Sequence, residues 1–291
     1  MREFCFGNWQ IVSAAECGGN LACVRWCGHD IMHGFSDISQ WAKAPAIYGF
    51  PVLFPPNRIA DGVFRFRNKT YRLPLNEPER SNHLHGIALS EKWQENKISG
   101  NGFEMFWEFN KNSPAYINYP FDCKLVVSYT FSGNSFIQKL CVENNSALPM
   151  PCAAGFHSSF NAPERFLIHG TGKRIELLPP YYRASGREID WTENAFSPNK
   201  WCSPPDLRQS GHFKMDETHS AELDHRDFQI RYTVDEKFNH WMVWKPEQEN
   251  GFLCIEPMNI KVGTFENDPD SLPALEPGEC MNFISRVEII C

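Results

Sequence analysis

The stretch Leu125–Phe131 (LVVSYTF) decides the fold class of this chain. Apolar side chains recur at every second position along it, which is the period of a β-strand with one buried face. Residues 132–134 (SGN) follow as a turn, and Phe136–Val142 then returns as a second strand. We therefore predict an antiparallel hairpin at this point of the chain.

Segments on both sides of this hairpin repeat the pattern. A second hairpin is expected at residues 63–73, where two alternating stretches flank an Asn68-Lys69 turn. Further strands are expected at residues 9–12, 21–26, 103–109, 175–178, 227–232, 238–244, 251–256 and 282–290. Residues 36–43 are expected to form one or two helical turns capped by Ser36, and residues 179–221 are the least regular part. The chain is thus predicted to be all-β, a large antiparallel β-sandwich with few short helices, in one domain over residues 1–291.

Composition limits the classes of partner. The 291 residues are 42% hydrophobic and 22% charged, which is typical of a globular protein. Aromatic residues make up 14%, a share that favours strands and supplies surfaces for stacking on ring-shaped ligands. The net charge is −7 and the basic residues are scattered. Nucleic acid and anionic membrane surfaces are therefore not expected as partners.

The cysteines and the start of the chain suggest a compartment. There are 11 cysteines, an odd number at irregular spacing, and neither a second pair nor a histidine pair accompanies Cys23 and Cys27. A zinc site is therefore not expected. Residues 1–5 lack the apolar run of a signal peptide, and no stretch has the length of a transmembrane helix. We expect free thiols in a reducing compartment and a cytoplasmic protein.

Two acid–base candidates stand far apart in the chain. His157 lies in Gly155–Asn161 (GFHSSFN), between aromatic residues in a run bounded by prolines. It is either a half-buried core residue or a proton-transfer group, and the segment alone does not separate the two. Glu256 closes an apolar run just before Pro257. If it is buried it must be paired, protonated or functional, because burying a bare charge is costly; at a strand end it would instead lie in water.

Two further candidates lie nearer the N-terminus. Arg58 emerges from a proline-bounded loop, where it could either donate a fork of hydrogen bonds to ligand oxygens or pair with a neighbouring carboxylate. His83 and His85 would face the same side of a strand, and Gly86 would let a backbone or ligand approach His85 closely. No other metal ligand follows at a suitable spacing, so we expect no metal site.

Five segments together resemble the aldose 1-epimerase (galactose mutarotase-like) family. They are residues 56–62 (PNRIADG), 82–86 (NHLHG), 155–161 (GFHSSFN), 254–257 (CIEP) and 275–279 (LEPGE), in the order of the family and spread over nearly the whole chain. The resemblance implies a large antiparallel β-sandwich with a sugar site in a cleft on one sheet. It also implies interconversion of the α and β anomers of an aldose, with neither a metal nor an organic cofactor.

The matching motifs carry residue roles with them. The resemblance makes His157 the general acid and Glu256 the general base, with Arg58 and His85 binding sugar oxygens. It also implies a sugar-binding aspartate in the irregular region, for which Asp216 is the best match and Asp224 the competitor. The chemistry suits these residues, since a histidine near its usual pKa can give or take a proton at neutral pH and partial burial raises the pKa of a glutamate towards neutrality.

Other functions remain open at this point. A mutarotase for hexose 6-phosphates would need further basic residues at the cleft rim, and suitable loops hold Arg183, Arg187, Lys200 and Arg208. A non-catalytic carbohydrate-binding protein on the same fold would not need both His157 and Glu256. A glycoside hydrolase would want two carboxylates across the scissile bond. The sequence names neither the sugar nor the oligomeric state.

Overall fold

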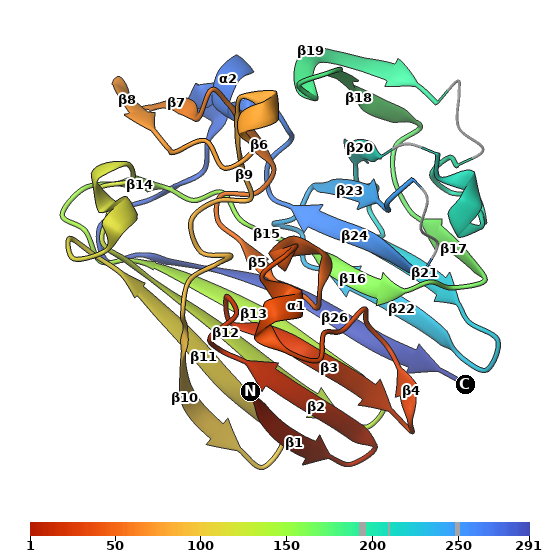
Figure 1. Cartoon of the computed structure of the whole chain (residues 1–291). Helices are drawn as coiled ribbons and strands as arrows, with labels where there is room; N and C mark the ends of the chain where they lie inside the picture. The colour runs from red at the N-terminus through yellow and green to blue at the C-terminus, as the bar shows by residue number, and fades with distance from the viewer. Residues whose placement is uncertain (192–195, 209, 248–250) are drawn as a thin grey trace.

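β-Strands make up most of the regular structure of the chain (Figure 1). The computed structural model describes residues 1–191, 196–208, 210–247 and 251–291. The helical segments of these residues are all short: α1 (Ile38–Trp41), α2 (Thr264–Asn267), and the 3₁₀ turns η1 (Pro45–Ile47), η2 (Pro78–Arg80), η3 (Pro114–Ile117), η4 (Pro204–Asp206) and η5 (Pro269–Ser271). None of the described helices is long and apolar enough to cross a membrane. The predicted all-β class with few short helices is confirmed.

The largest sheet has eight antiparallel strands. The hairpin predicted from the alternating stretch forms part of it, and its turn residue Gly133 has φ +57°. Buried positions alternate along the first strand of this hairpin, so the predicted apolar face is the core face. In order across the sheet the strands are β10 (Gln94–Ser99), β11 (Gly102–Phe109), β12 (Cys123–Ser132), β13 (Ser135–Asn144), β26 (Cys280–Ile290), β22 (Gln229–Val234), β21 (Ser220–Asp224) and β17 (Arg165–Ile168).

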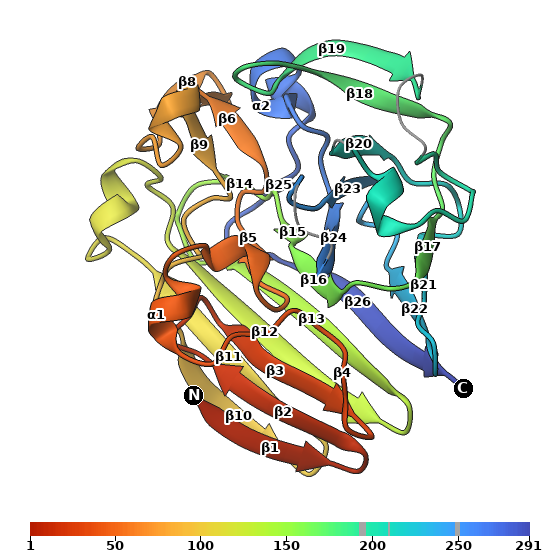
Figure 2. The same cartoon turned by 45° about the vertical axis from the view of Figure 1, so that its right-hand side comes forward.

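Two smaller sheets pack against this large sheet (Figure 2). One contains β1 (Arg2–Phe6), β2 (Trp9–Ala14), β3 (Asn20–Trp26) and β4 (His29–Asp30); the other has six strands, β20 (Gly211–Lys214), β23 (His240–Trp244), β24 (Phe252–Met258), β15 (Gly155–Phe156), β5 (Val52–Leu53) and, paired with β24, β16 (Ser158–Asn161). Trp9 of the first sheet contacts Phe131 of β12. Phe160 and Trp241 of the second contact Tyr232 of β22. Aromatic contacts thus join both small sheets to the large one, which makes the predicted sandwich.

Small two-stranded sheets lie on the outer side of the six-stranded sheet. They are β6 (Arg58–Ala60) with β9 (Asn82–Leu84), β7 (Val63–Phe66) with β8 (Lys69–Arg72), and β18 (Lys173–Leu178) with β19 (Arg183–Asp190); β14 (Met150–Pro151) pairs with β25 (Ala274–Leu275) elsewhere. In both views β6–β9, α2, β18 and β19 lie on the side of this sheet that faces away from the large sheet (Figures 1 and 2). The outer two-stranded sheets therefore bring residues from the first third of the chain over β15 and β24.

Three local predictions were wrong. β19 is a strand of eight residues inside the region expected to be irregular, because it pairs with β18. Asp37 rather than Ser36 caps α1, since its carboxylate accepts the hydrogen bond from a backbone N–H of the first turn. The second hairpin turns at Arg67-Asn68 rather than one residue later; both residues have positive φ, which two-residue hairpin turns favour.

Candidate active site

His157 and Glu256 meet because neighbouring strands share one register. β15 and β16 both pair with β24, and the bridges on either side of His157 have the same register. That register puts His157 directly opposite Glu256, and directly opposite side chains on antiparallel strands lie close together on one face. The Nε2 atom of His157 is 3.3 Å from Oε1 of Glu256. Two residues far apart in the sequence thus form one pair in the middle of a sheet.

The pair is almost completely withdrawn from solvent. Only 5% of the His157 side chain and 3% of the Glu256 side chain are exposed. Burial disfavours the charged form of each group, so it raises the pKa of Glu256 to about 8, against the opposing field of Arg58, and lowers the pKa of His157 to about 3. Between these values the pair holds one proton. Two groups in contact that share one proton can take a proton at one atom and give one at the other.

His157 and Glu256 line a cavity of about 320 Å³, which we call the central cavity. Within the described residues, three buried polar atoms beside it have no hydrogen-bond partner: Nδ1 of His157, Nδ1 of His85 and Oε2 of Glu256. Buried polar groups are normally hydrogen-bonded, so these are the atoms that a ligand would satisfy. The described lining residues are Ala46, Ile47, Asn57, Arg58, Glu77, Arg80, Leu84, His85, His157, Ser210, Met242, Trp244 and Glu256.

His85 reaches the central cavity from the residue that follows β9. Its φ is +63°, and its N–H donates to the carbonyl of Asn57 at 3.0 Å. The next residue, Gly86, has φ +79°, and a Cβ there would lie 2.0 Å from the carbonyl oxygen of Phe54. Glycine is therefore required at this position. The sequence predicted that a backbone or ligand comes close here, and the segment that does so is the backbone of Phe54. The ring of His85 stands edge-on to that of His157, with centroids 5.1 Å apart.

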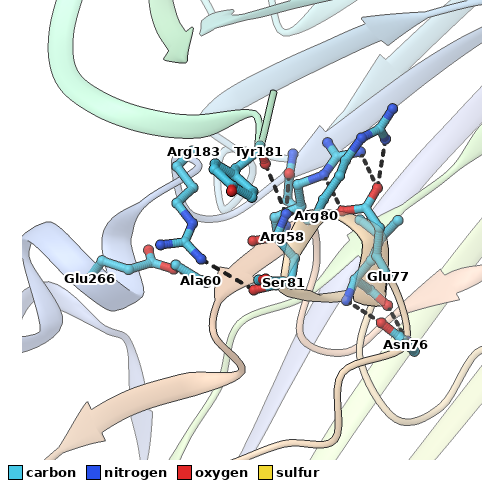
Figure 3. A network of polar contacts seen from close by, with 12 residues as sticks. Arg58, Ala60, Asn76, Glu77, Arg80, Ser81, Tyr181, Arg183 and Glu266 are labelled. Atoms are coloured by element: carbon cyan, nitrogen blue, oxygen red, sulfur yellow. Dashed lines mark hydrogen bonds and ion pairs between the residues drawn. The ribbon is translucent and has the colours of Figure 1, made fainter. Parts of the chain in front are cut away.

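Arg58 makes a fork of hydrogen bonds to a carboxylate beside the central cavity (Figure 3). Its Nε and one amino group donate to the two oxygens of Glu77 at 2.7 and 2.8 Å. Arg80 and Asn82 donate to the same carboxylate at 2.7 and 3.0 Å. Burial acts to raise the pKa of Glu77, but the hydrogen bonds from Arg58, Asn82 and Arg80 lower it to about 2. The pairing of Arg58 with a neighbouring carboxylate is thus observed, and Arg58 also lines the cavity.

Comparison with known proteins places this site in a family. The aldose 1-epimerase family model matches residues 10–288 of the chain. The chain belongs to the aldose 1-epimerase family. Galactose mutarotase of Sus scrofa is 29% identical over 133 residues, 45% of this chain and 37% of that protein, and the uncharacterized protein YihR of Escherichia coli is 27% identical over 108 residues, 36% of this chain and 34% of that protein. These alignments thus span about a third of each curated relative.

Solved structures share the fold of this aldose 1-epimerase family member over almost its whole length. A galactose mutarotase-like protein from Clostridium acetobutylicum matches with a TM-score of 0.90 at 22% identity, covering 99% of this chain and 94% of that one. A putative aldose 1-epimerase from Escherichia coli matches with a TM-score of 0.84 at 16% identity, covering 99% of this chain and 97% of that one. At such identities the match shows the fold alone, which is the predicted galactose mutarotase-like sandwich.

Neither aspartate assigned to the sugar by family resemblance lines the central cavity. Asp216 lies in the turn after β20, where its carboxylate accepts hydrogen bonds from the backbone and hydroxyl of Thr218 beside a different depression. Asp224 ends β21 in the large sheet and pairs with Arg165 at 2.6 Å. Asp216 thus lies outside the central cavity, because the chain has already left the six-stranded sheet at this residue. Ser210, just before β20, is the described residue of this region that does line the cavity.

The sequence did not reveal every residue of the site. Glu77 and Arg80 have a visible signal in retrospect, because the loop NEPER places acidic and basic residues between the two matching segments around Arg58 and His85. Met242 and Trp244 line the cavity as alternate residues of β23, and Met242 pairs directly with Glu256. The sequence shows that these two residues alternate along a strand. It does not show that β24 is the neighbouring strand that places them on this face.

His83 does not share the position of His85. It is buried, and its Nδ1 lies 2.7 Å from the carbonyl oxygen of Pro74. β9 ends one residue before His85, so the prediction that both rings face the same side of a strand is wrong. Among the residues described, no group of three or more His, Cys, Asp or Glu could hold a metal ion.

The buried carboxyl of Glu256 makes stability depend on pH. Its pKa in the folded protein, about 8, lies above the ordinary value of 4.5, so the fold favours the protonated form and loses stability as pH rises from about 4.5 towards 8. Replacing Glu256 with Gln is therefore expected to increase the free energy of unfolding by about 1–3 kcal/mol at pH 9. The gain should shrink to near zero at pH 4.5, as measured by denaturant titration at both values.

The matched control for this measurement is Glu108→Gln. Glu108 is 58% exposed and lies 3.9 Å from Lys124. Removing an exposed carboxylate should change stability little at either pH. An equal gain in both variants, or a loss of stability in Glu256→Gln at pH 9, would contradict the burial argument.

Proposed function

We propose that this chain is an aldose 1-epimerase that interconverts the α and β anomers of a hexose by opening and reclosing the sugar ring. The observation that carries the proposal is the buried His157–Glu256 pair on the wall of the central cavity. Membership of the aldose 1-epimerase family supports it. We assign the activity to a single domain of residues 1–291. We also propose a cytoplasmic location, because none of the eleven cysteines, all in described segments, forms a disulfide.

The proposed reaction uses one proton-accepting and one proton-donating group. The pair reacts in the form that carries its shared proton on His157, which the 3.3 Å contact between the two side chains allows. The Glu256 carboxylate then takes the proton of the anomeric hydroxyl while His157 gives its proton to the ring oxygen, and the C1–O5 bond breaks to leave an open-chain aldehyde. Rotation about C1–C2 then presents the other face of the carbonyl. Reclosure runs the two proton transfers backwards, so the pair ends with the proton it began with. Each such group typically contributes about 10²–10⁴-fold to a rate.

Arg58 and His85 are proposed to hold the sugar. Both line the central cavity, and each is set by its own support: Arg58 by Glu77, and His85 by the positive φ and the close backbone approach at Gly86. Fixing a substrate against its proton-transfer groups lowers the entropic part of the barrier. The indole of Trp244, whose centroid is 6.4 Å from that of His157, supplies an aromatic wall against the apolar face of the ring.

A sugar panel tests the proposal. The purified protein should raise the rate of anomer exchange of at least one hexose above the buffer rate, followed by polarimetry or by NMR exchange spectroscopy. Rates that stay at the buffer value for every sugar would refute the enzyme. If the same sugars still bound, the second candidate from the sequence, a carbohydrate-binding protein on this fold, would replace it.

The reaction should fail at high pH. The pair holds one proton between the two pKa values, about 3 for His157 and about 8 for Glu256, and loses it above the higher one. His157 then has no proton to give, although Glu256 is fully able to accept one. We expect kcat/KM to be flat from pH 5 to 7 and to fall about tenfold per pH unit well above pH 8, measured by NMR exchange with the uncatalysed rate subtracted. A rate that rises through pH 8 would contradict the shared proton.

A further inference from the structure

Two arginines converge on one carboxylate at the edge of the central cavity (Figure 3). Arg58 and Arg80 both donate to Glu77, and both line the cavity. Arg58 uses its Nε and one amino group, whereas Arg80 uses a single amino group. In the described structure the other donors of Arg80 have no hydrogen-bond partner. Its side chain is 37% exposed, against 18% for Arg58, so Arg80 keeps donors available to a ligand.

The charges around the central cavity do not balance. Among its described lining residues, the two guanidinium groups face one carboxylate, Glu77, whose pKa of about 2 keeps it ionised. The Glu256–His157 pair is neutral overall when it holds its proton on the carboxyl, and burial lowers the pKa of His85, which keeps that ring neutral. One positive charge is left over, in a chain whose net charge is −7. An anionic group on the ligand would compensate it, and a neutral sugar would not.

The arginine pair is also held in place before any ligand arrives. The ring of Tyr182 lies 4.6 Å from the guanidinium carbon of Arg80 and 5.5 Å from that of Arg58. Asn82 ties the Glu77 carboxylate to the carbonyl of Tyr181, with hydrogen bonds of 3.0 and 2.8 Å. A guanidinium fixed by an aromatic face and a carboxylate loses little freedom when it binds an oxyanion, and its planar fork matches phosphate, sulfonate and carboxylate groups.

We propose that the substrate is an aldose that carries an anionic group, and that Arg80 is the residue that selects it by pairing with that group. The proposal rests on the proposed function, because it places the anomeric carbon at His157 and Glu256 and the anionic group at Arg80 in the same cavity. The sequence offered other candidates for such a clamp, and none of them is among the described residues that line the central cavity: Arg183, Arg187, Lys200 and Arg208. Arg183 pairs with Asp61 and lines a neighbouring cavity instead.

The test compares neutral and anionic sugars on the same assay. Anomer exchange is measured by NMR for glucose and galactose, and for glucose 6-phosphate and glucuronate, which carry the anion as phosphate and as carboxylate. We expect kcat/KM for at least one anionic sugar to exceed that for glucose. In Arg80→Gln the ratio of anionic to neutral kcat/KM should fall by about 10- to 100-fold, the usual range for a lost charged hydrogen bond. Arg80→Lys, which keeps the charge, should recover part of the ratio.

Arg183→Gln is the matched control, because it also removes a partly exposed, ion-paired arginine from the outer layer. It should leave the ratio unchanged. Added salt should weaken the preference for the anionic sugar in the wild type and act little in Arg80→Gln. Comparing glucose 6-phosphate with glucuronate shows whether the protein prefers a phosphate or a carboxylate. No preference for either anionic sugar, or an equal fall on neutral and anionic sugars in Arg80→Gln, overturns the proposal.

Failure of the proposed function gives a different result. If no sugar is anomerised, binding of glucose 6-phosphate, glucuronate and glucose is measured by calorimetry on the wild type and Arg80→Gln. Tighter binding of an anionic sugar that is lost in Arg80→Gln would uphold the selection by Arg80 without catalysis. Equal binding of all three in both proteins would overturn it.

Discussion

Replacing Glu256 with Gln should lower kcat for anomer exchange by about 10²–10⁴-fold, and His157→Asn should do the same. Each variant removes one of the two proposed proton-transfer groups, whose side chains lie 3.3 Å apart. Glutamine keeps the volume of the carboxyl but accepts no proton, so the sheet should remain intact. NMR exchange at saturating sugar measures the loss, and circular dichroism with thermal unfolding checks the fold. Residues that act as one unit are not additive, so the double variant should be hardly slower than either single one.

Asp216→Asn is the control for this experiment. Family resemblance alone would give Asp216 a sugar contact, whereas the structure places its carboxylate in a turn with Thr218, away from the central cavity. We expect kcat and KM of this variant to stay within about twofold of the wild type, as is usual for substitutions away from a site. A loss as large as that of Glu256→Gln would show that the structural placement of the site is wrong. If Glu256→Gln kept a rate close to that of the wild type, Glu256 would not be the base.

Gly86→Ala should destabilise the fold by about 2–4 kcal/mol and reduce sugar binding. The added Cβ would lie 2.0 Å from the carbonyl oxygen and 2.1 Å from the carbonyl carbon of Phe54, both backbone atoms that cannot rotate away. The backbone must therefore shift, and His85 is the adjoining residue that lines the central cavity. Denaturant unfolding measures the first effect, and KM for the best sugar of the panel measures the second.

Gly278→Ala separates the clash from backbone strain. Gly278 has the same φ of +79°, but a Cβ there would meet no heavy atom within 4 Å. Its substitution should cost only the strain of a left-handed alanine, about 1 kcal/mol, and should leave KM unchanged. If both variants lose the same stability, the approach of Phe54 to Gly86 has no energetic consequence.

Local sequence patterns were sufficient to predict the structure wherever a strand with alternating apolar residues turns back into a hairpin. The hairpin of β12 and β13 was predicted with its buried face, because period-two alternation and a glycine turn are both encoded within about twenty neighbouring residues. Even the need for glycine beside His85 was visible in the sequence. Errors of one residue, as at Asp37 and Arg67-Asn68, arose where several neighbouring side chains suit the same cap or turn.

Patterns failed where a residue's role depends on a distant partner. Glu256 was expected at the end of a strand, yet it lies inside β24 and is 2% exposed, because β15, β16 and β23 flank it. The carboxylate partner of Arg58 comes from a loop 19 residues away. Asp216 matched a family position in sequence, but the turn after β20 takes it out of the site.

The order of amino acids therefore established the all-β class, the family, and four of the side chains that line the central cavity: Arg58, His85, His157 and Glu256. Only the three-dimensional fold decided that His157 faces Glu256 and that both side chains are buried. It also decided that Arg58 and Arg80 donate to the same carboxylate. The reason is physical. Alternation and turn chemistry act between neighbours in the chain, whereas strand register and burial, which set distances and pKa values, arise only when remote segments pack together.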